Sequence, residues 1–316
     1  MIEGIAVKDF EVSEDKVLVK LRNGDELSGE VIIGAGGSYD LVSKRIREIE
    51  NMPMNWRDED IAMALYFEVD VGREFMDEVY GEERISMAHI KYDGLDGYGW
   101  SFSKDTVLNV GIGCPRNIIK KLKSEKKGWS ERKYLLDYVE TLKEQGWFPK
   151  DIEVDRKMIS GANIPVGMGM SCTVGDRMMV VGDAGGFVSP LSGEGLYYAL
   201  DSGRLAAESL DVLFPEGNFN KQDLMHYHRA WSSKWGDDLE WLKVGWHLLM
   251  VMPNSLIKYA ALDEETKEFF THMFVGSMPA AKIKNKVLAL IAKGVLKHEV
   301  LSLMTGNKQT VPELVS

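Results

Sequence analysis

A glycine-rich segment that carries one carboxylate follows a hydrophobic run in the middle of the chain. Residues from Val174 to Val181 predict a short buried strand after a turn at residues 174–177, and Asp183 follows within the sequence Gly-Asp-Ala-Gly-Gly. Residues from Gly193 to Leu210 have the small-residue composition of a closely packed helix. Glycines let the backbone approach a ligand closely, and free N–H groups at a helix start attract an electron-rich or anionic group. The segment is therefore typical of a cofactor-binding loop, in which Asp183 accepts hydrogen bonds from sugar or polyol hydroxyls.

The same stretch, from residue 180 to residue 200, resembles the second flavin-contacting motif of the para-hydroxybenzoate-hydroxylase-like flavoproteins. In that superfamily a Gly-Asp pair contacts the ribityl chain of FAD, and a proline and the glycines after it lie along the isoalloxazine. The alternative is an ordinary strand-to-helix turn without a ligand. The resemblance implies FAD as the cofactor, bound by Gly182, Asp183, Pro190, Gly193 and Gly195.

A second segment narrows the resemblance to one family. Residues 98–104 and 109–113 resemble the Tyr-x-Trp-x-Phe-Pro-Lys and Asn-Val-Gly-x-Gly stretches of geranylgeranyl reductases, with Ser in place of Pro at position 103. Side chains alternate along a strand, so Tyr98, Trp100 and Phe102 share one face and form an aromatic wall suited to an isoprenoid chain. The alternative is a sheet face packed on a core helix.

A third segment, from Gly161 to Gly167, resembles the Gly-Ala-x-Ile-Pro-x-Gly stretch that precedes the Gly-Asp loop in these reductases. We expect a structural role for it, with Pro165 and Gly167 setting a turn between two domains.

The chain does not open on a dinucleotide-binding unit. A flavoprotein of this type begins with a strand, a Gly-x-Gly-x-x-Gly turn and a helix that hold the FAD pyrophosphate. Residues 1–20 instead predict two strands joined by a turn, with a further hairpin turn at 22–25. We expect that about a hundred residues of such a unit are lacking. Either the start is misassigned or the gene is split, so that a companion N-terminal segment supplies the pyrophosphate site, or the truncation is real and FAD is no longer used.

A fourth landmark runs from residue 31 to residue 42. It resembles a hydrophobic strand ending in Gly-Ala-Asp-Gly, followed by a Ser-x-Val-Arg helix start. Gly36 stands where the family has Asp, Asp40 where it has Ser, and Ser43 where it has Arg. The carboxylate and the basic group that help to order the flavin phosphates, or a pyridine nucleotide, are therefore missing from those positions. Gly37 keeps the family's glycine and is counted with the cofactor-binding residues.

Composition indicates a folded protein without a nucleic-acid partner. The chain has 316 residues, 45% hydrophobic content and a net charge of −11, whereas binding to phosphate backbones needs a basic face. Cys114 and Cys172 give no disulfide framework and fit a reducing cytoplasm, each as a small buried hydrophobe. His226 and His228 point in different directions on a helix and predict no metal site. Residues 1–4 lack the basic start and the long apolar run of a signal peptide, so we expect none, and the apolar runs are too short to predict a membrane span.

A basic amphipathic helix is predicted near the end of the chain. Apolar residues between Ile283 and Val295 recur at helical spacing, and five lysines fall between residues 282 and 297. Such a helix predicts peripheral contact with an anionic membrane, at the inner face in a cytoplasmic protein. The alternative is a helix docked on its own domain, with solvated lysines.

These landmarks predict an α/β (α+β) fold. Residues 1–48 and 159–215 form the remaining part of a Rossmann-like FAD-binding domain, and residues 49–158 form an inserted substrate domain built on an antiparallel sheet. Residues 216–316 form a helical C-terminal region.

The leading functional hypothesis, implied by the resemblance, is an FAD-dependent reductase of geranylgeranyl double bonds. Its substrates are prenylated lipids, such as those of archaeal membranes, or pigment precursors. One alternative is a flavin-dependent monooxygenase or halogenase, and another is a non-catalytic remnant that binds prenyl lipid or acts as a scaffold. The catalytic residues and the electron donor, ferredoxin or NAD(P)H, stay open. Tyr98 is a proton-donor candidate by position alone, with aromatic packing as the other role.

Overall fold

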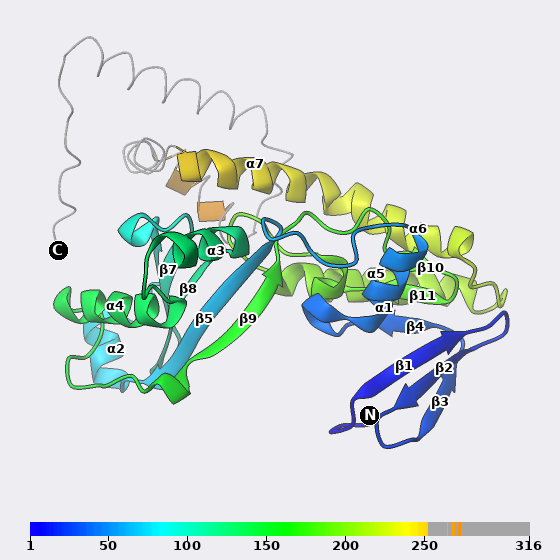
Figure 1. The fold of residues 1–316 in the computed structure, drawn as a ribbon, viewed down its shortest axis with the longest axis horizontal. Helices are drawn as coiled ribbons and strands as arrows, with labels where there is room; N and C mark the ends of the chain where they lie inside the picture. The colour runs from blue at the N-terminus through cyan, green and yellow to red at the C-terminus, as the bar shows by residue number, and fades with distance from the viewer. Residues whose placement is uncertain (252–263, 265–266, 269–270, 273–316) are drawn as a thin grey trace, which may run out of the picture. The chain divides into compact units, whose positions relative to one another are not determined.

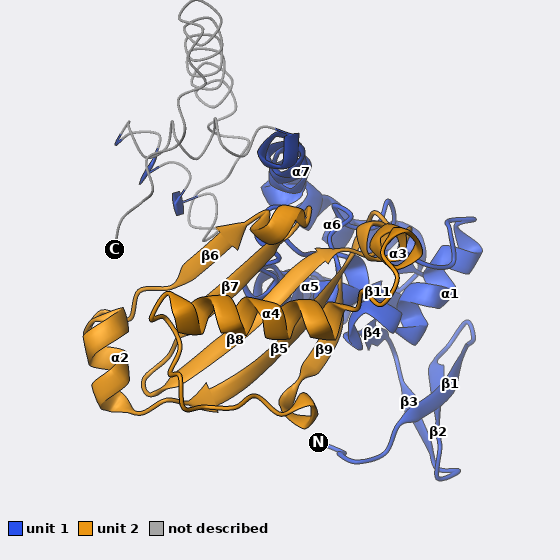
Figure 2. Ribbon diagram, turned by 60° about the vertical axis from the view of Figure 1, so that its left-hand side comes forward, with its two compact units in different colours: residues 1–56, 165–316 blue, residues 57–164 orange. Residues whose placement is uncertain are grey.

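A computed structural model describes residues 1–251, 264, 267–268 and 271–272 of the chain. The chain divides into unit 1, residues 1–56 and 165–316, and unit 2, residues 57–164 (Figure 2). The inserted domain predicted over 49–158 thus corresponds to a unit that begins and ends later. Strand β9 (Ser160–Pro165) is hydrogen-bonded into the sheet of unit 2, so the chain leaves that unit only after the strand.

The N-terminal residues of unit 1 form a three-stranded antiparallel meander. Its strands are β1 (Val7–Val12), β2 (Val17–Leu21) and β3 (Glu26–Gly29), in that spatial order (Figure 1). The first turn closes with a hydrogen bond of 2.9 Å from the Ser13 N–H to the Lys16 carbonyl. The second turn places Gly24 at a φ of 94°, a conformation that glycine adopts at little cost. Both hairpin turns lie where the sequence predicts them.

A second small sheet forms the centre of unit 1. Its order is β10 (Val174–Gly175), β11 (Met178–Val180) and β4 (Ile32–Gly34), and β11 runs parallel to β4. The turn predicted at residues 174–177 is present, with Arg177 at a φ of 55°, but residues 174–175 also pair with residues 178–179 and form a strand of their own. Around this sheet lie the 3₁₀ turns η1 (Gly37–Tyr39) and η4 (Gly182–Gly185) and the helices α1 (Leu41–Ile49) and α5 (Leu196–Leu213).

Helices complete the described part of unit 1. Helix α6 (Lys221–Trp231) leads through the π-helical turn η5 (Ser232–Gly236) into α7 (Asp237–Val251). Their core includes Leu224, Tyr227, Trp231 and Trp235, which pack with residues of α5. The amphipathic segment predicted near residues 283–295 lies outside the described residues. Within the described part of the chain, no helix has the length and hydropathy needed to cross a membrane.

Unit 2 is a five-stranded sheet with helices on one face. The strand order is β6 (Met87–Ile90), β7 (Tyr98–Ser103), β8 (Val107–Pro115), β5 (Ile61–Asp70) and β9. Pairs β6–β7, β7–β8 and β5–β8 are antiparallel, as the sequence predicts. Helix α4 (Glu131–Glu144) contacts β5 and β8 and runs across the sheet (Figure 2). Unit 2 also contains α2 (Arg73–Tyr80), α3 (Arg116–Glu125), η2 (Tyr92–Gly94) and η3 (Arg156–Met158).

Two glycines on β8 lie under the same tryptophan and give a matched stability test. A Cβ added at Gly111 would lie 2.2 Å from Cζ2 of Trp100 and 2.7 Å from the Leu65 carbonyl oxygen. A Cβ added at Gly113 would lie 3.4 Å from the same indole, an ordinary contact. We expect Gly111→Ala to lower the free energy of unfolding by about 1–3 kcal/mol through overpacking.

Gly113→Ala is the control and should have a clearly smaller effect. Urea unfolding followed by circular dichroism measures both changes. Equal effects of the two substitutions would contradict the close approach of Trp100 to Gly111.

Candidate functional site

The candidate site lies where two adjacent parallel strands of unit 1 end. Strands β4 and β11 pair from Ile32–Met178 to Gly34–Val180, and the Val181 N–H donates to the Gly34 carbonyl at 3.0 Å. Each strand leads into a glycine turn, η1 after β4 and η4 after β11, and the two turns contact each other. Ligands of α/β proteins bind at the carboxyl ends of parallel strands. Pairing of β4 with β11 therefore joins two segments that the sequence presents separately.

The first glycine turn is filled by the side chain of Asp40. Its Oδ1 accepts the Ser43 N–H at 2.8 Å and caps α1, while its Oδ2 accepts the Gly36 N–H at 2.9 Å. A Cβ added at Gly34 would lie 2.2 Å from Asp40 Oδ1, and one at Gly36 would lie 2.8 Å from Oδ2. Glycines are therefore required at both positions. The carboxylate that the sequence lacks at position 36 is present at this turn, supplied by residue 40.

Gly37, the other candidate residue of this turn, has a φ of 77° and no atom within 4 Å of an added Cβ. Its backbone is therefore open to a close approach by a ligand.

The second glycine turn holds the candidate residues Gly182 and Asp183. The Gly182 N–H donates to Ser202 Oγ at 2.9 Å, and a Cβ added there would lie 3.2 Å from Ala199 Cβ, so α5 packs closely against the turn. Asp183 is half-buried, and burial raises the pKa of its carboxyl group. Among the described residues, no side chain donates a hydrogen bond to this carboxylate. Asp183 thus has unused capacity to accept hydrogen bonds.

The loop that follows carries the candidate residues Pro190, Gly193 and Gly195. Pro190 is buried, and Gly193 has a φ of 73° and donates its N–H to the Ser189 carbonyl at 2.9 Å. Gly195 is the N-cap of α5, and a Cβ added there would lie 3.4 Å from Asp183 Oδ1. The three residues therefore line the path from η4 to α5, with the Asp183 carboxylate beside Gly195.

The start of α5 differs from the sequence prediction. The helix begins at Leu196 instead of Gly193, because residues 187–195 form an irregular loop. The Tyr197 N–H at this start is already bonded to Oε1 of Glu194 at 2.8 Å, so it is not free for a ligand. Glu194 Oε2 is buried and has no hydrogen-bond partner.

Trp56 joins the two glycine turns, and sequence reasoning missed it. Its Nε1–H donates to the Ser38 carbonyl at 3.1 Å, next to η1. Its Cη2 atom would lie 2.4 Å from a Cβ added at Gly186, next to η4. The guanidinium carbon of Arg47 lies 3.9 Å from the centre of the Trp56 ring. The sequence does contain a signal for Arg47. It stands four residues after Ser43, and positions i and i+4 share one face of a helix.

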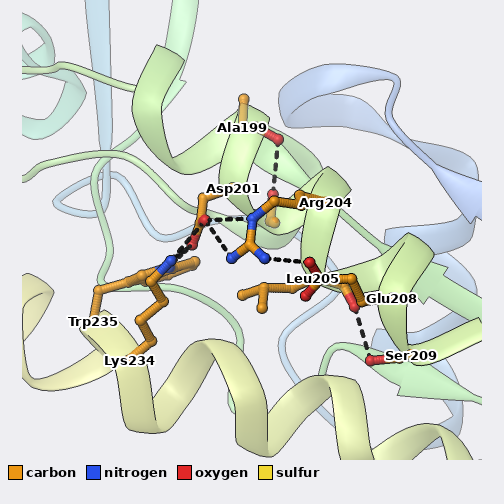
Figure 3. A network of polar contacts seen from close by, with 9 residues as sticks. Ala199, Asp201, Arg204, Leu205, Glu208, Ser209, Lys234 and Trp235 are labelled. Atoms are coloured by element: carbon orange, nitrogen blue, oxygen red, sulfur yellow. Dashed lines mark hydrogen bonds and ion pairs between the residues drawn. The ribbon is translucent and has the colours of Figure 1, made fainter.

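A buried ion-pair network holds α5 in place (Figure 3). Asp201, only 8% exposed, accepts hydrogen bonds from Lys234 Nζ at 2.8 and 2.9 Å, from Arg204 Nη2 at 2.9 Å and from Trp235 Nε1 at 2.9 Å. Burial acts to raise the pKa of Asp201, but these donors hold it below its usual value. The network ties α5 to the π-helical turn η5. It thereby fixes the helix whose Ser202 holds the Gly182 N–H.

The aromatic candidates of unit 2 form one row along β7. Ring centres are 5.6 Å apart for Tyr98 and Trp100, and 5.9 Å apart for Trp100 and Phe102. The opposite face of β7 meets α4, because a Cβ added at Gly99 would lie 2.7 Å from the Tyr138 ring. The row therefore lies on the face of β7 that points away from α4.

Two titratable groups of unit 2 are unsuited to acid–base chemistry at neutral pH. Burial raises the pKa of Tyr98 to about 12, which makes this phenol a weaker acid than usual. Burial is also the main cause that raises the pKa of the Cys114 thiol to about 12, so the thiol stays neutral. Cys114 and Cys172 are both buried and unpaired. No cluster of potential metal ligands occurs among the described residues.

Sequence comparison finds relatives among isoprenoid lipid reductases. The chain is 32% identical over 219 residues to a digeranylgeranylglycerophospholipid reductase from Methanoculleus marisnigri, which covers 68% of this chain and 48% of the relative. The chain spans less than half the length of the curated relatives that it matches. No protein-family model matches the sequence.

Solved structures show the same fold. A geranylgeranyl bacteriochlorophyll reductase-like protein from Thermoplasma acidophilum aligns with a TM-score of 0.66 and 17% identity, over 93% of this chain and 68% of the other. A flavin-dependent halogenase aligns with a TM-score of 0.52 and 18% identity, over 75% and 40% of the two chains.

The raised pKa of Asp183 predicts that its charge destabilises the ligand-free protein. Because the pKa of Asp183 is higher in the folded state than in the unfolded state, its ionisation lowers the free energy of unfolding at pH values above the folded-state pKa. This loss disappears at pH values below the unfolded-state pKa of about 3.9. We expect Asp183→Asn to raise the free energy of unfolding by about 1 kcal/mol at pH 7.5, with no gain near pH 4.

Asp211→Asn, at an exposed position of the same helix α5, is the matched control and should change neither value. Thermal unfolding of the ligand-free chain at both pH values measures the difference. Destabilisation by Asp183→Asn at pH 7.5 would refute the unpartnered state of this carboxylate.

Proposed function

We propose, from the premise that the chain is homologous to the geranylgeranyl reductase family of FAD-dependent oxidoreductases, that it acts in the FAD-dependent reduction of isoprenoid carbon–carbon double bonds. The observation that carries the proposal is the pair of contacting glycine turns at the carboxyl ends of β4 and β11. Such a strand edge suits a large cofactor, because the backbone of both turns can approach it closely.

The residues at this edge fit a flavin with a polyol side chain. Asp183 has a half-buried carboxylate with a raised pKa and no side-chain donor among the described residues. Ribityl hydroxyls would supply the missing donors and stabilise its ionised form. We assign the cofactor to the following residues: Gly37, Gly182, Asp183, Pro190, Gly193 and Gly195.

When bound in its reduced form, the flavin would supply a hydride to a carbon–carbon double bond, which also takes up one proton. The role of the chain at this site is to orient the cofactor and to hold the turns rigid. Ser202 fixes the Gly182 N–H, and the Asp201 network fixes the helix that carries Ser202. Such preorganisation lowers the entropy lost when a bound group reaches its reactive position.

Unit 2 supplies an apolar surface for the isoprenoid chain. Tyr98, Trp100 and Phe102 present three adjacent rings on one face of β7. Trp100 packs across Gly111 and Gly113 and donates its Nε1–H to Asn109 Oδ1 at 2.7 Å, so its indole is fixed on the sheet. Fixed aromatic rings bury large apolar areas at low entropic cost. The substrate class that fits is a prenylated lipid, as the names of the relatives also suggest.

Tyr98 belongs to this packing surface and is not the proton donor in the proposal. A phenol with a pKa near 12 releases a proton less readily than an ordinary tyrosine. Its ring, next to Trp100, extends the apolar row instead.

Removal of the Asp183 carboxylate tests flavin binding. We expect Asp183→Asn in the full chain to weaken FAD binding about tenfold or more, because hydrogen bonds to a charged acceptor are lost. Asp211→Asn should bind FAD like the wild type. Quenching of flavin fluorescence measures the dissociation constants. Equal affinities in all three proteins would refute the assignment of Asp183 to the cofactor.

The aromatic row can be tested without changing the proposed cofactor site. We expect Phe102→Ser to weaken binding of a geranylgeranyl phospholipid by about threefold to tenfold, through the loss of apolar contact area. Phe102→Leu, which keeps the apolar surface, is the matched control and should change the affinity less than twofold. FAD affinity should stay unchanged in both variants. Equal lipid binding by the serine and leucine variants would contradict the role of the row.

Two parallel assays with chemically reduced FAD, one anaerobic and one with oxygen present, distinguish the classes of activity. Saturation of geranylgeranyl double bonds, detected by mass spectrometry, supports a reductase. Oxygen consumption coupled to hydroxylation or halogenation, without alkene reduction, would point to a monooxygenase or halogenase. Lipid binding without flavin binding would point to a non-catalytic protein.

A further inference from the structure

Arg47 is a buried cation that has no anionic partner within the described part of the chain. Its side chain lies on α1, and the residue is 6% exposed. Nη1 donates to the Pro53 carbonyl at 3.0 Å, whereas Nη2 is buried without any hydrogen-bond partner. Burial lowers the pKa of the guanidinium, with no opposing contribution from a carboxylate. The group still carries its charge at neutral pH, because arginine is an extremely weak acid.

A buried charge without a partner destabilises the folded state, and proteins retain such groups mainly where a ligand or a function requires them. The stacking of Arg47 on Trp56 offsets part of this cost through a cation–π interaction. It does not neutralise the charge. An anion bound at the candidate site would offset the positive charge of Arg47.

The position of Arg47 connects this charge to the candidate site. The Trp56 ring on which it stacks reaches the Ser38 carbonyl beside η1 and packs against Gly186 beside η4. Arg47 therefore lies one aromatic layer away from both glycine turns. Few water molecules intervene in such a packed layer, so the field of the charge is weakly screened.

Helix α1 explains why a charge at position 47 can replace one at position 43. Ser43, which stands where the related motif has Arg, lies one helical turn before Arg47, and both side chains are buried on the same helix. The carboxylate of the same motif is displaced in the same direction, from position 36 to Asp40, which lies over Gly36. The folded chain thus has a carboxylate over Gly36 and a buried guanidinium on α1, each four residues further along than the charged group of the motif.

We propose that Arg47 supplies the fixed positive charge of the candidate site, so that the site prefers ligands that carry a phosphate group. The charge acts through the Trp56 layer, which makes Arg47 a positioning residue. The phosphate belongs to a dinucleotide, either the flavin cofactor or a pyridine nucleotide. The inference rests on the proposed function, since that proposal places a cofactor at these turns.

The experiment compares ligands that differ only in their phosphates. Full-length wild type, Arg47→Met and the control Arg45→Met are titrated with FAD and with riboflavin, which shares the isoalloxazine and ribityl chain but has no phosphate. Arg45 lies on the same helix, half-exposed, near Glu48. We expect Arg47→Met to weaken FAD binding at least tenfold and riboflavin binding less than twofold, while Arg45→Met changes neither.

Salt adds a second readout. Because a buried charge is screened less than a surface charge, the loss in Arg47→Met should persist in about 0.5 M NaCl. Equal weakening of FAD and riboflavin binding would mean that Arg47 only supports the fold, and it would overturn the proposal. An unchanged FAD affinity would also overturn it.

Two further arms keep the outcome independent of flavin binding. Titration with NADPH and with sodium pyrophosphate, followed by thermal unfolding, identifies the source of the phosphate. If the wild type binds no flavin, the proposed function fails. In that case, stabilisation of the wild type but not of Arg47→Met by NADPH or pyrophosphate still supports the charge assignment. No difference between the two proteins with any phosphate ligand overturns it.

Folding of the variants is controlled separately. Arg47→Met removes a buried charge and should unfold, without ligand, at or above the wild-type temperature. Arg47→Lys keeps the charge without the planar stacking group, and it should retain a preference for FAD over riboflavin. Loss of that preference in the lysine variant would overturn the role of charge, even if Arg47→Met proves insoluble.

Discussion

The parallel pairing of β4 with β11 is the interaction on which the candidate site depends. Three residue pairs and the bond from the Val181 N–H to the Gly34 carbonyl hold two strands that are far apart in the sequence. Because the strands are parallel, both glycine turns emerge at the same edge and contact each other. If the strands were antiparallel, the two turns would lie at opposite edges. The parallel pairing of these three residue pairs therefore decides whether a single binding site exists.

Helix α5 stabilises the glycine turns at this edge. Strand pairs this short contribute little stability alone, and α5 adds the missing rigidity through Ser202, which binds the Gly182 N–H. Helix α5 is in turn held by Asp201, whose carboxylate has donors from Lys234, Arg204 and Trp235. A fully satisfied buried carboxylate of this kind fixes one arrangement of the helices. Asp183, which has no side-chain donor among the described residues, and Asp201, which has three, thus have opposite roles within one unit.

Local signals in the sequence predict much of the fold but little of how its parts meet. The hairpin turns before β2 and β3, the aromatic alternation of β7 and the helix nature of α5 follow from turn residues and spacing. The turn before β11 was predicted, but strand β10 was missed, because two residues are too few to show an alternating pattern. Trp56 was missed because its partners, Ser38 and Gly186, are distant in the chain.

Asp40 and Arg47 show why a motif should be compared by location in space as well as by position. A carboxylate at residue 36 and one at residue 40 can occupy the same volume, because the η1 turn folds Asp40 back over Gly36. A side chain at residue 36 would then collide with Asp40. Glycine at position 36 and aspartate at position 40 therefore depend on each other. Ser43 and Arg47 are related by one helical turn in the same way. A position-by-position comparison finds three departures here, whereas the folded chain has a carboxylate over Gly36 and a buried guanidinium one helical turn after Ser43.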